Sequence, residues 1–256
     1  MSVVPKKALG QHFLADENIL GVIERLAELG PDDVALEIGP GLGVLTRRLA
    51  DRARHVHAVE LDRSLEPHLR ELADRRNVDL HWGDALALDL AALDPAPTKL
   101  VANLPYSVAT PIVAESLAGL PSLEHWTVMV QREVADRFFA EPSTKAYGAV
   151  SVLVQLAARR TGFHPVARTV FRPPPNVDSA LVAFRRTALP DGFARVKAVV
   201  EAAFAHRRKT LPNSLALAGL ASRDEAAAAL GRIGRAPDTR AEALAPPEFV
   251  ELARAL

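Results

Sequence analysis

The chain of 256 residues contains no cysteine. This absence excludes a disulfide scaffold and any thiolate metal site, and we expect no metal centre. No apolar stretch reaches the roughly 18 residues that span a bilayer, and no apolar run follows Lys6 and Lys7 as it would in a secretory signal. We therefore expect a cytoplasmic protein without a membrane partner.

An excess of charge of either sign is also missing, because 31 Lys and Arg residues balance 31 Asp and Glu residues. Taken alone, zero net charge argues mildly against a nucleic-acid partner. The basic residues nevertheless cluster at Lys6–Lys7, at Arg185–Arg186 and over residues 206–209. The simplest interpretation of each cluster is a solvated surface.

The first 140 residues alternate between short apolar runs and amphipathic segments. This pattern predicts strands over residues 34–38, 56–61, 78–82, 99–104 and 126–130. It predicts helices over residues 44–54, 64–75 and 109–117, and a further helix that ends at 138. Such alternation indicates an α/β fold, in which helices cover both faces of a mostly parallel sheet.

The pattern changes beyond this part, where residues 148–158 are apolar almost throughout. Two further strands are predicted, over residues 161–164 and 180–185. From Gly192 onward the sequence is rich in alanine and helical in pattern. We therefore expect two domains, residues 1–188 and residues 189–256, of which the second is small and helical.

A glycine-rich segment, Gly39 to Gly43, directly follows the first predicted strand. Glycines there let the backbone turn sharply and let a ligand approach, although a simple strand-to-helix turn would look the same. Glu37, Glu60 and Asp84 fall near the carboxyl ends of strands, where sheets of this type bind ligands. Glu60 follows the loop by about 20 residues, a spacing that suits a carboxylate accepting both hydroxyls of a ribose.

Two ligands contain such a ribose, a nicotinamide dinucleotide and S-adenosylmethionine. The dinucleotide loop, Gly-x-Gly-x-x-Gly, would need glycine at position 44, where this chain has valine. A dinucleotide also needs partners for its pyrophosphate, and the loop has Pro40 and Leu42 instead. The sequence therefore favours S-adenosylmethionine.

The fourth predicted strand ends in Asn103-Leu104-Pro105-Tyr106, similar to the Asn/Asp-Pro-Pro-Tyr motif of amino-group methyltransferases. An adenine amine is a poor nucleophile because its lone pair is delocalised into the ring. Acceptors aimed at its two N–H bonds let the nitrogen turn that lone pair toward a sulfonium methyl. The Asn103 side-chain oxygen and the Leu104 carbonyl, held extended by Pro105, are the candidates. By itself the motif fits an amine of adenine, of cytosine or of a glutamine side chain.

Two aromatic residues are candidates for holding a flat base. Tyr106 offers a face to a base taken out of its stack, a contact that contributes roughly 1–3 kcal/mol per base. Phe171, which precedes the stiff Pro173–Pro175 segment, is the candidate for the opposite wall. The alternatives are a core aromatic at a strand end for Tyr106 and packing under a loop for Phe171.

Several motifs together resemble one family, the ribosomal RNA adenine dimethyltransferases. The matching segments are Gly10–Leu14, Glu37–Gly43, Glu60–Asp62, Gly83–Ala85, Asn103–Tyr106, Val170–Ala180 and Phe204–Leu215. They span nearly the whole chain in order. The resemblance implies a Rossmann-like class I S-adenosylmethionine-dependent methyltransferase domain followed by a small C-terminal α-helical domain.

The resemblance also implies roles for individual residues. The implied cofactor-binding residues are His12, Leu14, Gly39, Gly41, Glu60, Leu61, Asp84, Ala85 and Asn103. Asn103, Leu104, Pro105, Tyr106 and Phe171 would be catalytic, and Arg207, Arg208 and Lys209 would bind RNA. The chain departs from the pattern at His12, where many relatives have asparagine, and at Pro212, where a basic residue is common.

The family has a branch that dimethylates two adjacent adenines in a hairpin loop near the 3′ end of small-subunit RNA. Another branch acts on large-subunit RNA and confers macrolide resistance. The Gly-Pro-Gly-Leu-Gly loop, the triple proline and the Arg-Arg-Lys-Thr-Leu segment favour the first branch. We expect a monomer that acts on 16S ribosomal RNA within a 30S assembly particle. An assembly factor without the chemistry is a further alternative, against which the intact Asn-Leu-Pro-Tyr counts.

Overall fold

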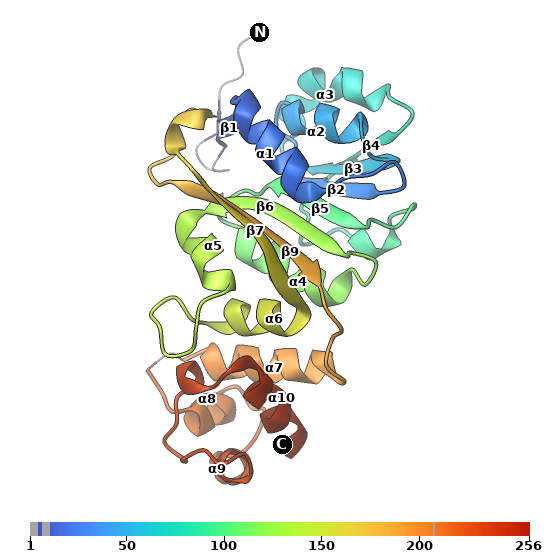
Figure 1. Ribbon diagram of the computed structural model, residues 1–256. Coiled ribbons are helices and arrows are strands. Elements are labelled where there is room, and N and C mark those ends of the chain that lie inside the picture. The colour runs from blue at the N-terminus through green and yellow to red at the C-terminus, as the bar shows by residue number, and fades with distance from the viewer. Residues whose placement is uncertain (1–4, 7–10, 207) are drawn as a thin grey trace. The chain divides into compact units, whose positions relative to one another are not determined.

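The computed structural model describes residues 5–6, 11–206 and 208–256 of the chain. The chain forms two compact units, whose residues can be found in Figure 1 from the colour bar. The first comprises residues 1–135 and 160–186, and the second comprises residues 136–159 and 187–256. The second unit thus contains residues 136–159, which the sequence-based division places in the first domain. The division at residue 188 stays a prediction.

One mixed sheet forms the centre of the first unit (Figure 1). Within the described residues its strands are β2 (Val34–Ile38), β3 (His55–Glu60), β4 (Val78–Trp82), β5 (Lys99–Asn103), β6 (His125–Gln131), β7 (Ala158–Val166) and β9 (Ser179–Arg186). Their order is β4-β3-β2-β5-β6-β9-β7. The pairs from β4 to β6 are parallel, and β9 runs antiparallel to β6. All five residues of β2 are buried, as expected for a strand covered on both faces.

Helices cover both faces of this sheet, which confirms the predicted α/β fold (Figure 1). The helices that follow its strands or precede them are α1 (Glu17–Ala27), α2 (Val44–Ala50), α3 (Glu66–Ala73), α4 (Ala109–Gly119) and α5 (Arg132–Phe138). Helices α1, α2 and α3 lie on one face, and α4 lies on the other. Short 3₁₀ turns precede α3 at η2 (Arg63–Leu65), lie between β4 and β5 at η3 (Leu90–Ala92) and follow β7 at η4 (Arg168–Val170).

One core cluster of the first unit lies between the sheet and helices α1 to α3. Helix α1 begins after Asp16, whose side chain accepts a hydrogen bond from the Ile19 N–H and so caps the helix. Its buried residues Leu20 and Ile23 recur on one side and pack with the residues that α2 and β3 contribute. Burying each such side chain contributes about 1.5–3 kcal/mol.

A second, two-stranded sheet ties the N-terminal segment to a distant loop. Strand β1 (Phe13–Leu14) pairs antiparallel with β8 (Phe171–Arg172). Leu14 lies opposite Phe171, and the Ala15 N–H donates to the Val170 carbonyl at 3.1 Å. Residues 13–15 are therefore held beside the loop that carries the triple proline.

The strand order reverses at β2, which has β3 on one side and β5 on the other. The chain first builds outward through β3 and β4, and then crosses to the opposite side to build β5 and β6. Connections on opposite sides leave a crevice beyond the carboxyl ends of β2 and β5, where open sheets of this kind bind ligands.

The second unit is built mainly from helices, as the sequence predicts for the C-terminal residues. They are α6 (Ala149–Ala157), α7 (Phe193–Phe204), α8 (Leu211–Leu217), α9 (Arg223–Arg232) and α10 (Pro246–Ala255), with a 3₁₀ turn η5 (Ala241–Ala243). The buried Tyr147 donates its hydroxyl to the Leu244 carbonyl at 2.8 Å. Its ring meets the edge of Phe204, which in turn packs on Phe249. In the described part of the chain, none of the helices combines the length and apolar character needed to cross a membrane.

Candidate active site

A cavity of about 200 Å³ opens in the first unit beyond the carboxyl ends of β2, β3 and β5. The residues implied for cofactor binding all line it, namely His12, Leu14, Gly39, Gly41, Glu60, Leu61, Asp84, Ala85 and Asn103. Leu104, Pro105 and Tyr106 complete the lining on the side of β5. The cavity thus brings together motifs that are spread over more than 90 residues of sequence.

The glycine loop is shaped by positive φ angles, which favour glycine. Gly39 has φ +77° and Gly41 has φ +59°. A Cβ added to Gly41 would lie 3.1 Å from a ring carbon of Phe13, so the loop and β1 pack too closely to admit a side chain. The Gly41 N–H donates to a carboxylate oxygen of Glu60 at 3.1 Å, which fixes the loop against the end of β3.

Glu60 ends β3 with its carboxylate nearly buried, at 7% exposure. Its other oxygen accepts from the Asp62 N–H at 2.9 Å. Burial raises the pKa of Glu60, and hydrogen bonds from backbone N–H groups, among them those of Asp62 and Gly41, partly oppose that rise. Each carboxylate oxygen has a second lone pair, so Glu60 can also accept from a ribose hydroxyl.

Glu37 is a buried carboxyl in the wall of the same cavity, at 1% exposure. Burial raises its pKa to about 8, the charge of Glu60 adds to the rise, and the Thr46 hydroxyl opposes it. Among the described residues, no hydrogen-bond partner reaches its Oε2. A buried carboxyl oxygen without a partner fits a cationic ligand, since a positive group would compensate the cost of burying charge. S-adenosylmethionine, with its ammonium and sulfonium groups, meets that requirement.

The opposite end of the cavity carries the residues implied for the adenine of the cofactor. Asp84 is exposed, and its Oδ1 accepts from the Leu86 N–H at 2.9 Å, which sets the turn after β4. Leu61 is 55% exposed although it is apolar. An exposed apolar side chain and a carboxylate that line the same cavity suit a purine ring and its amine.

The N-terminal segment is fastened beside the cavity by Asp62. Lys6 Nζ donates to one oxygen of Asp62 at 2.6 Å, and Gln11 Nε2 donates to the other at 2.8 Å. Burial raises the pKa of Asp62, but the hydrogen bonds from Lys6, Ser64 and Gln11 outweigh it and hold the pKa well below its usual range. Sequence reasoning assigned no role to Asp62 or Gln11, although both lie in the matching segments.

Asn103 ends β5, and a hydrogen bond to the N-terminal segment orients its side chain. Its Nδ2 donates to the His12 carbonyl at 3.3 Å. A carbonyl only accepts, so the amide nitrogen must face His12 and Oδ1 must point the other way. The Leu104 N–H donates to the Met129 carbonyl at 3.0 Å, which continues the pairing of β5 with β6 and holds the motif in place.

Tyr106 stacks on His12, with ring centroids 5.8 Å apart and an interplanar angle of 30°. The Tyr106 hydroxyl hydrogen-bonds Ser179 at 2.6 Å, and burial raises its pKa. His12 Nδ1 donates to the Pro173 carbonyl at 2.9 Å, so the loop of β8 positions its ring. The ring that stacks on Tyr106 is therefore His12, whereas the sequence predicted Phe171 for the wall on the opposite side of the base. Ser179 was also missed, although it lies in a matching segment.

The structure places Phe171 elsewhere than expected. It is 1% exposed, belongs to the core cluster and does not line the cavity. The cause is the pairing of β8 with β1, which puts Phe171 opposite Leu14 and directs its side chain into the core. Packing under the loop, the alternative for this residue, describes its position.

The residues implied for RNA binding belong to the second unit. Arg208 and Lys209 are exposed in the turn before α8, and the Lys209 N–H donates to the His206 carbonyl at 2.9 Å. Arg207 lies outside the described residues. Pro212 occupies the first turn of α8, where an N–H has no partner within the helix, so proline fits there without loss.

The fold and this cavity define the class of the protein, an S-adenosylmethionine-dependent methyltransferase. The sequence matches the ribosomal RNA adenine dimethylase family over residues 4–255, and the chain belongs to that family. This confirms both the resemblance and the predicted fold class.

Relatives cover nearly the whole chain. The ribosomal RNA small subunit methyltransferase A of Rubrobacter xylanophilus is 49% identical over 98% of this chain and 94% of its own length. The protein of the same name from Lactiplantibacillus plantarum is 47% identical over 98% of this chain and 90% of its own.

Two solved structures are also similar. The 23S rRNA methyltransferase ErmE is 31% identical with a TM-score of 0.65, covering 95% of this chain and 99% of that one. A dimethyladenosine transferase from Plasmodium falciparum has a TM-score of 0.74 at 22% identity, covering 94% and 96% of the two chains, and shares the fold.

Proposed function

We propose that this enzyme uses S-adenosylmethionine to dimethylate the N6 amines of two adjacent adenines in the 3′-terminal hairpin loop of 16S ribosomal RNA, as a step in small-subunit biogenesis. The observation that carries the proposal is the orientation of Asn103. Its donor nitrogen is taken by His12, so its acceptor oxygen remains for a substrate amine beside the cavity.

The cofactor is held by residues of β2, β3 and the turn after β4. Glu60 accepts from the ribose hydroxyls, Asp84 accepts from the adenine amine, and Glu37 faces the positive charge of the amino-acid end. Gly39 and Gly41 keep that end of the cavity free of side chains. When bound, S-adenosylmethionine supplies an electrophilic methyl carbon on a sulfonium.

The substrate amine is prepared by the motif at the end of β5. Asn103 Oδ1 and the Leu104 carbonyl accept its two N–H bonds, which directs the nitrogen lone pair away from them and toward the methyl carbon. Tyr106, stacked on His12, supports the flat base. Because these groups act by position and electrostatics, no strong base is needed. The second transfer uses a nitrogen with one N–H, so a single acceptor then suffices.

The small-subunit assignment is supported by the relatives at 39–49% identity that cover nearly the whole chain, all named small subunit methyltransferase A. ErmE, from the large-subunit branch, is less similar at 31% identity. The complete Asn-Leu-Pro-Tyr motif argues against an assembly factor that has lost the chemistry. We further propose that the enzyme is a cytoplasmic monomer whose substrate is a 30S assembly particle, with Arg208 and Lys209 among its phosphate contacts.

An assay with labelled S-adenosylmethionine tests the proposal. Small subunits with unmethylated RNA, naked 16S RNA and large-subunit RNA are supplied in parallel, and the modified adenines are mapped. We expect two dimethylated adenines in the 3′-terminal hairpin of the small-subunit RNA. Label confined to large-subunit RNA would assign the enzyme to the other branch. If no substrate were labelled, the result would favour an assembly factor that has lost the chemistry.

A further inference from the structure

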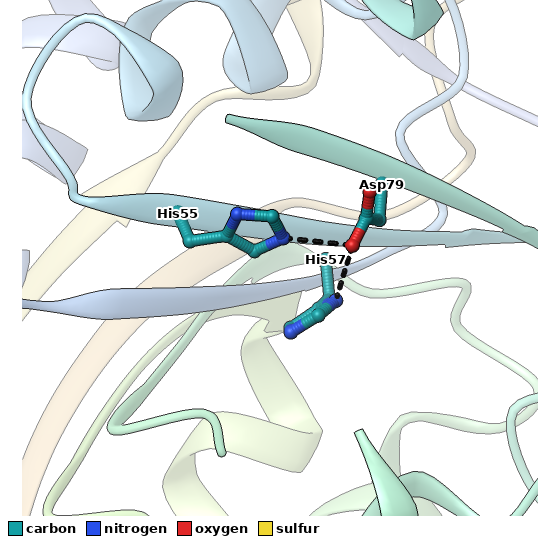
Figure 2. Close-up of side chains that lie close together, drawn as sticks. All are labelled: His55, His57 and Asp79. Carbon is teal, nitrogen blue, oxygen red and sulfur yellow. Dashed lines mark hydrogen bonds and ion pairs between the residues drawn. The ribbon is translucent and has the colours of Figure 1, made fainter. Parts of the chain in front are cut away.

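A cluster of imidazole and carboxylate groups lies outside the cavity, on strands β3 and β4. His55 and His57 are two residues apart on β3, so their side chains share one face of the sheet. The strand register places Asp79 of β4 directly beside His57. Figure 2 shows both imidazole rings turned toward the Asp79 carboxylate. None of the three lines the cofactor cavity.

The three side chains offer ligand atoms at the distances of a metal site. His55 Nε2 lies 2.9 Å and His57 Nδ1 lies 3.8 Å from Asp79 Oδ2, and all three atoms lie within 4.8 Å of one another. In a tetrahedral zinc site with bonds of about 2.0–2.1 Å, neighbouring ligand atoms are roughly 3.3 Å apart. The separations of 2.9 and 3.8 Å lie on either side of that value.

The ring of His57 is held in the tautomer that a metal requires. Its Nε2 lies 2.9 Å from the Pro95 carbonyl oxygen, which only accepts, so the ring proton is on Nε2. The lone pair on Nδ1 then faces Asp79 and His81, whose Nε2 lies 3.1 Å away. A backbone carbonyl that orients a ligating imidazole is the usual outer partner of zinc-bound histidine.

The exposure of the ligands suits an ion that enters from solvent. The His57 side chain is 1% exposed and anchors the cluster, His55 is 14% exposed, and Asp79 is 51% exposed. Burial lowers the pKa of His57 and of His81, which favours the neutral form of both rings. Neutral imidazoles and a carboxylate are the donor set that zinc takes when three protein ligands leave its fourth position to water.

We propose that His55 Nε2, His57 Nδ1 and Asp79 Oδ2 bind a zinc ion that links the edge strand β4 to β3. This changes the sequence-based expectation of no metal, which rested on the absence of thiolates. When zinc binds, the His55 proton moves from Nε2 to Nδ1, and His81 gives up its hydrogen bond to His57. The ion stabilises the strands whose carboxyl ends carry Glu60 and Asp84.

Zinc titration of the metal-free, full-length protein without a histidine tag tests this proposal. Binding is followed by calorimetry and by competition with a chromophoric zinc indicator, and Co²⁺ in place of zinc reports tetrahedral coordination by its visible absorption. We expect one ion per chain, at least tenfold weaker binding in H55Q and in D79N, and little binding of Mg²⁺. At about 100 times the Kd, zinc should raise the Tm by roughly 5–10 °C.

Matched controls are H68Q and D74N, which change the same residue types on and beside α3. Both should bind zinc like the unmodified chain, and all four variants should bind S-adenosylmethionine normally in EDTA, which shows that they are folded. H55Q and D79N test the site independently, so if one variant fails to fold, the other still tests the proposal. The proposal would be overturned if the unmodified protein did not bind zinc, or if H55Q and D79N bound zinc as tightly as the unmodified protein does.

Discussion

Asn103 contributes an acceptor whose direction is set by one hydrogen bond, from its amide nitrogen to His12. In the variant N103A the acceptor is lost, while Glu60 and the glycine loop remain. We expect methyl transfer to fall about 100-fold or more, the size of effect seen when one preorganised group is removed from a reacting centre. Single-turnover assays measure the transfer, and calorimetry should show that cofactor binding is largely retained. Transfer near the normal rate would contradict the role given to this side chain.

Tyr106 combines a stacking face with a hydroxyl that bonds Ser179. The variants Y106F and Y106A separate these contributions, because phenylalanine keeps the ring and loses only the hydrogen bond. If the ring holds the flipped base, Y106A should raise the KM for RNA by about 5- to 150-fold, corresponding to roughly 1–3 kcal/mol of stacking. Y106F should stay within a few-fold of the original enzyme. Equal losses in the two variants would mean that the hydroxyl, and not the ring, is needed.

His125 is a buried residue that makes stability depend on pH. Burial, with the charges of Arg185 and Lys99, lowers its pKa to about 4 in the folded chain. The unfolded chain binds a proton there below about pH 6.5 and the folded chain does not, so stability falls from pH 6.5 toward 4. Between pH 7 and pH 5 this residue should remove about 2 kcal/mol from the free energy of unfolding.

The variant H125F removes that titration while keeping a ring in the core. Urea unfolding at several pH values should show that the free energy of unfolding of H125F falls less steeply than that of the original chain. H68F, in which a partly exposed histidine of α3 is replaced, is the control and should keep the original slope. Parallel curves for H125F and the original chain would show that His125 is not the group responsible.

At the scale of elements, the glycine loop packs closely against β1. Gly41 and Gly192 have similar positive φ angles, +59° and +70°. Only Gly41 faces a neighbour, since its added Cβ would lie 3.1 Å from Phe13, whereas nothing lies within 4 Å of that position at Gly192. The variant G192A should therefore show the backbone cost alone, about 1 kcal/mol, and bind the cofactor normally.

The variant G41A adds displacement of β1 to the same backbone cost. We expect at least tenfold weaker binding of S-adenosylmethionine by calorimetry, because β1 carries His12 and Leu14 into the cavity. Thermal unfolding of both variants gives the backbone contribution for comparison. If G41A and G192A bound the cofactor equally well, the close contact between Gly41 and Phe13 would not contribute to cofactor binding.

The elements differ in how well the sequence predicts them. Strands β2 and β4 have the predicted bounds, because turn residues flank both segments. Helix α2 ends at Ala50, four residues before the predicted end at residue 54. The prediction was too long because Ala53, in the turn after the helix, is also buried and so continues the apolar pattern. Helix α1 was not predicted, although the cap residue Asp16 and the spacing of Leu20, Ile23 and Ala27 indicate it. Strands β1 and β8 have two residues each, too few for a pattern.

At the scale of the whole molecule, order along the chain indicates where the cavity lies, whereas the compact units also depend on contacts between distant segments. The cavity follows from a general property of parallel sheets, whose carboxyl ends meet at one edge. The position of Phe171 and the grouping of residues 136–159 depend on contacts between distant segments, such as the pairing of Leu14 with Phe171. Such contacts leave no local signal. The cluster of His55, His57 and Asp79 was missed for the same reason, since it arises from the register of β3 on β4.

The balance of 31 basic and 31 acidic residues makes RNA binding depend on where the basic side chains lie. If Arg208 and Lys209 each neutralise a phosphate, the double variant R208A/K209A should lower the slope of log K against log salt by about 1.5–2. The variant R223A/R254A changes the net charge equally at exposed positions of α9 and α10, and should leave the slope nearly unchanged. Filter binding to small-subunit RNA over a range of salt concentrations measures both. Equal slopes in the two variants would mean that net charge, and not a local contact, controls binding.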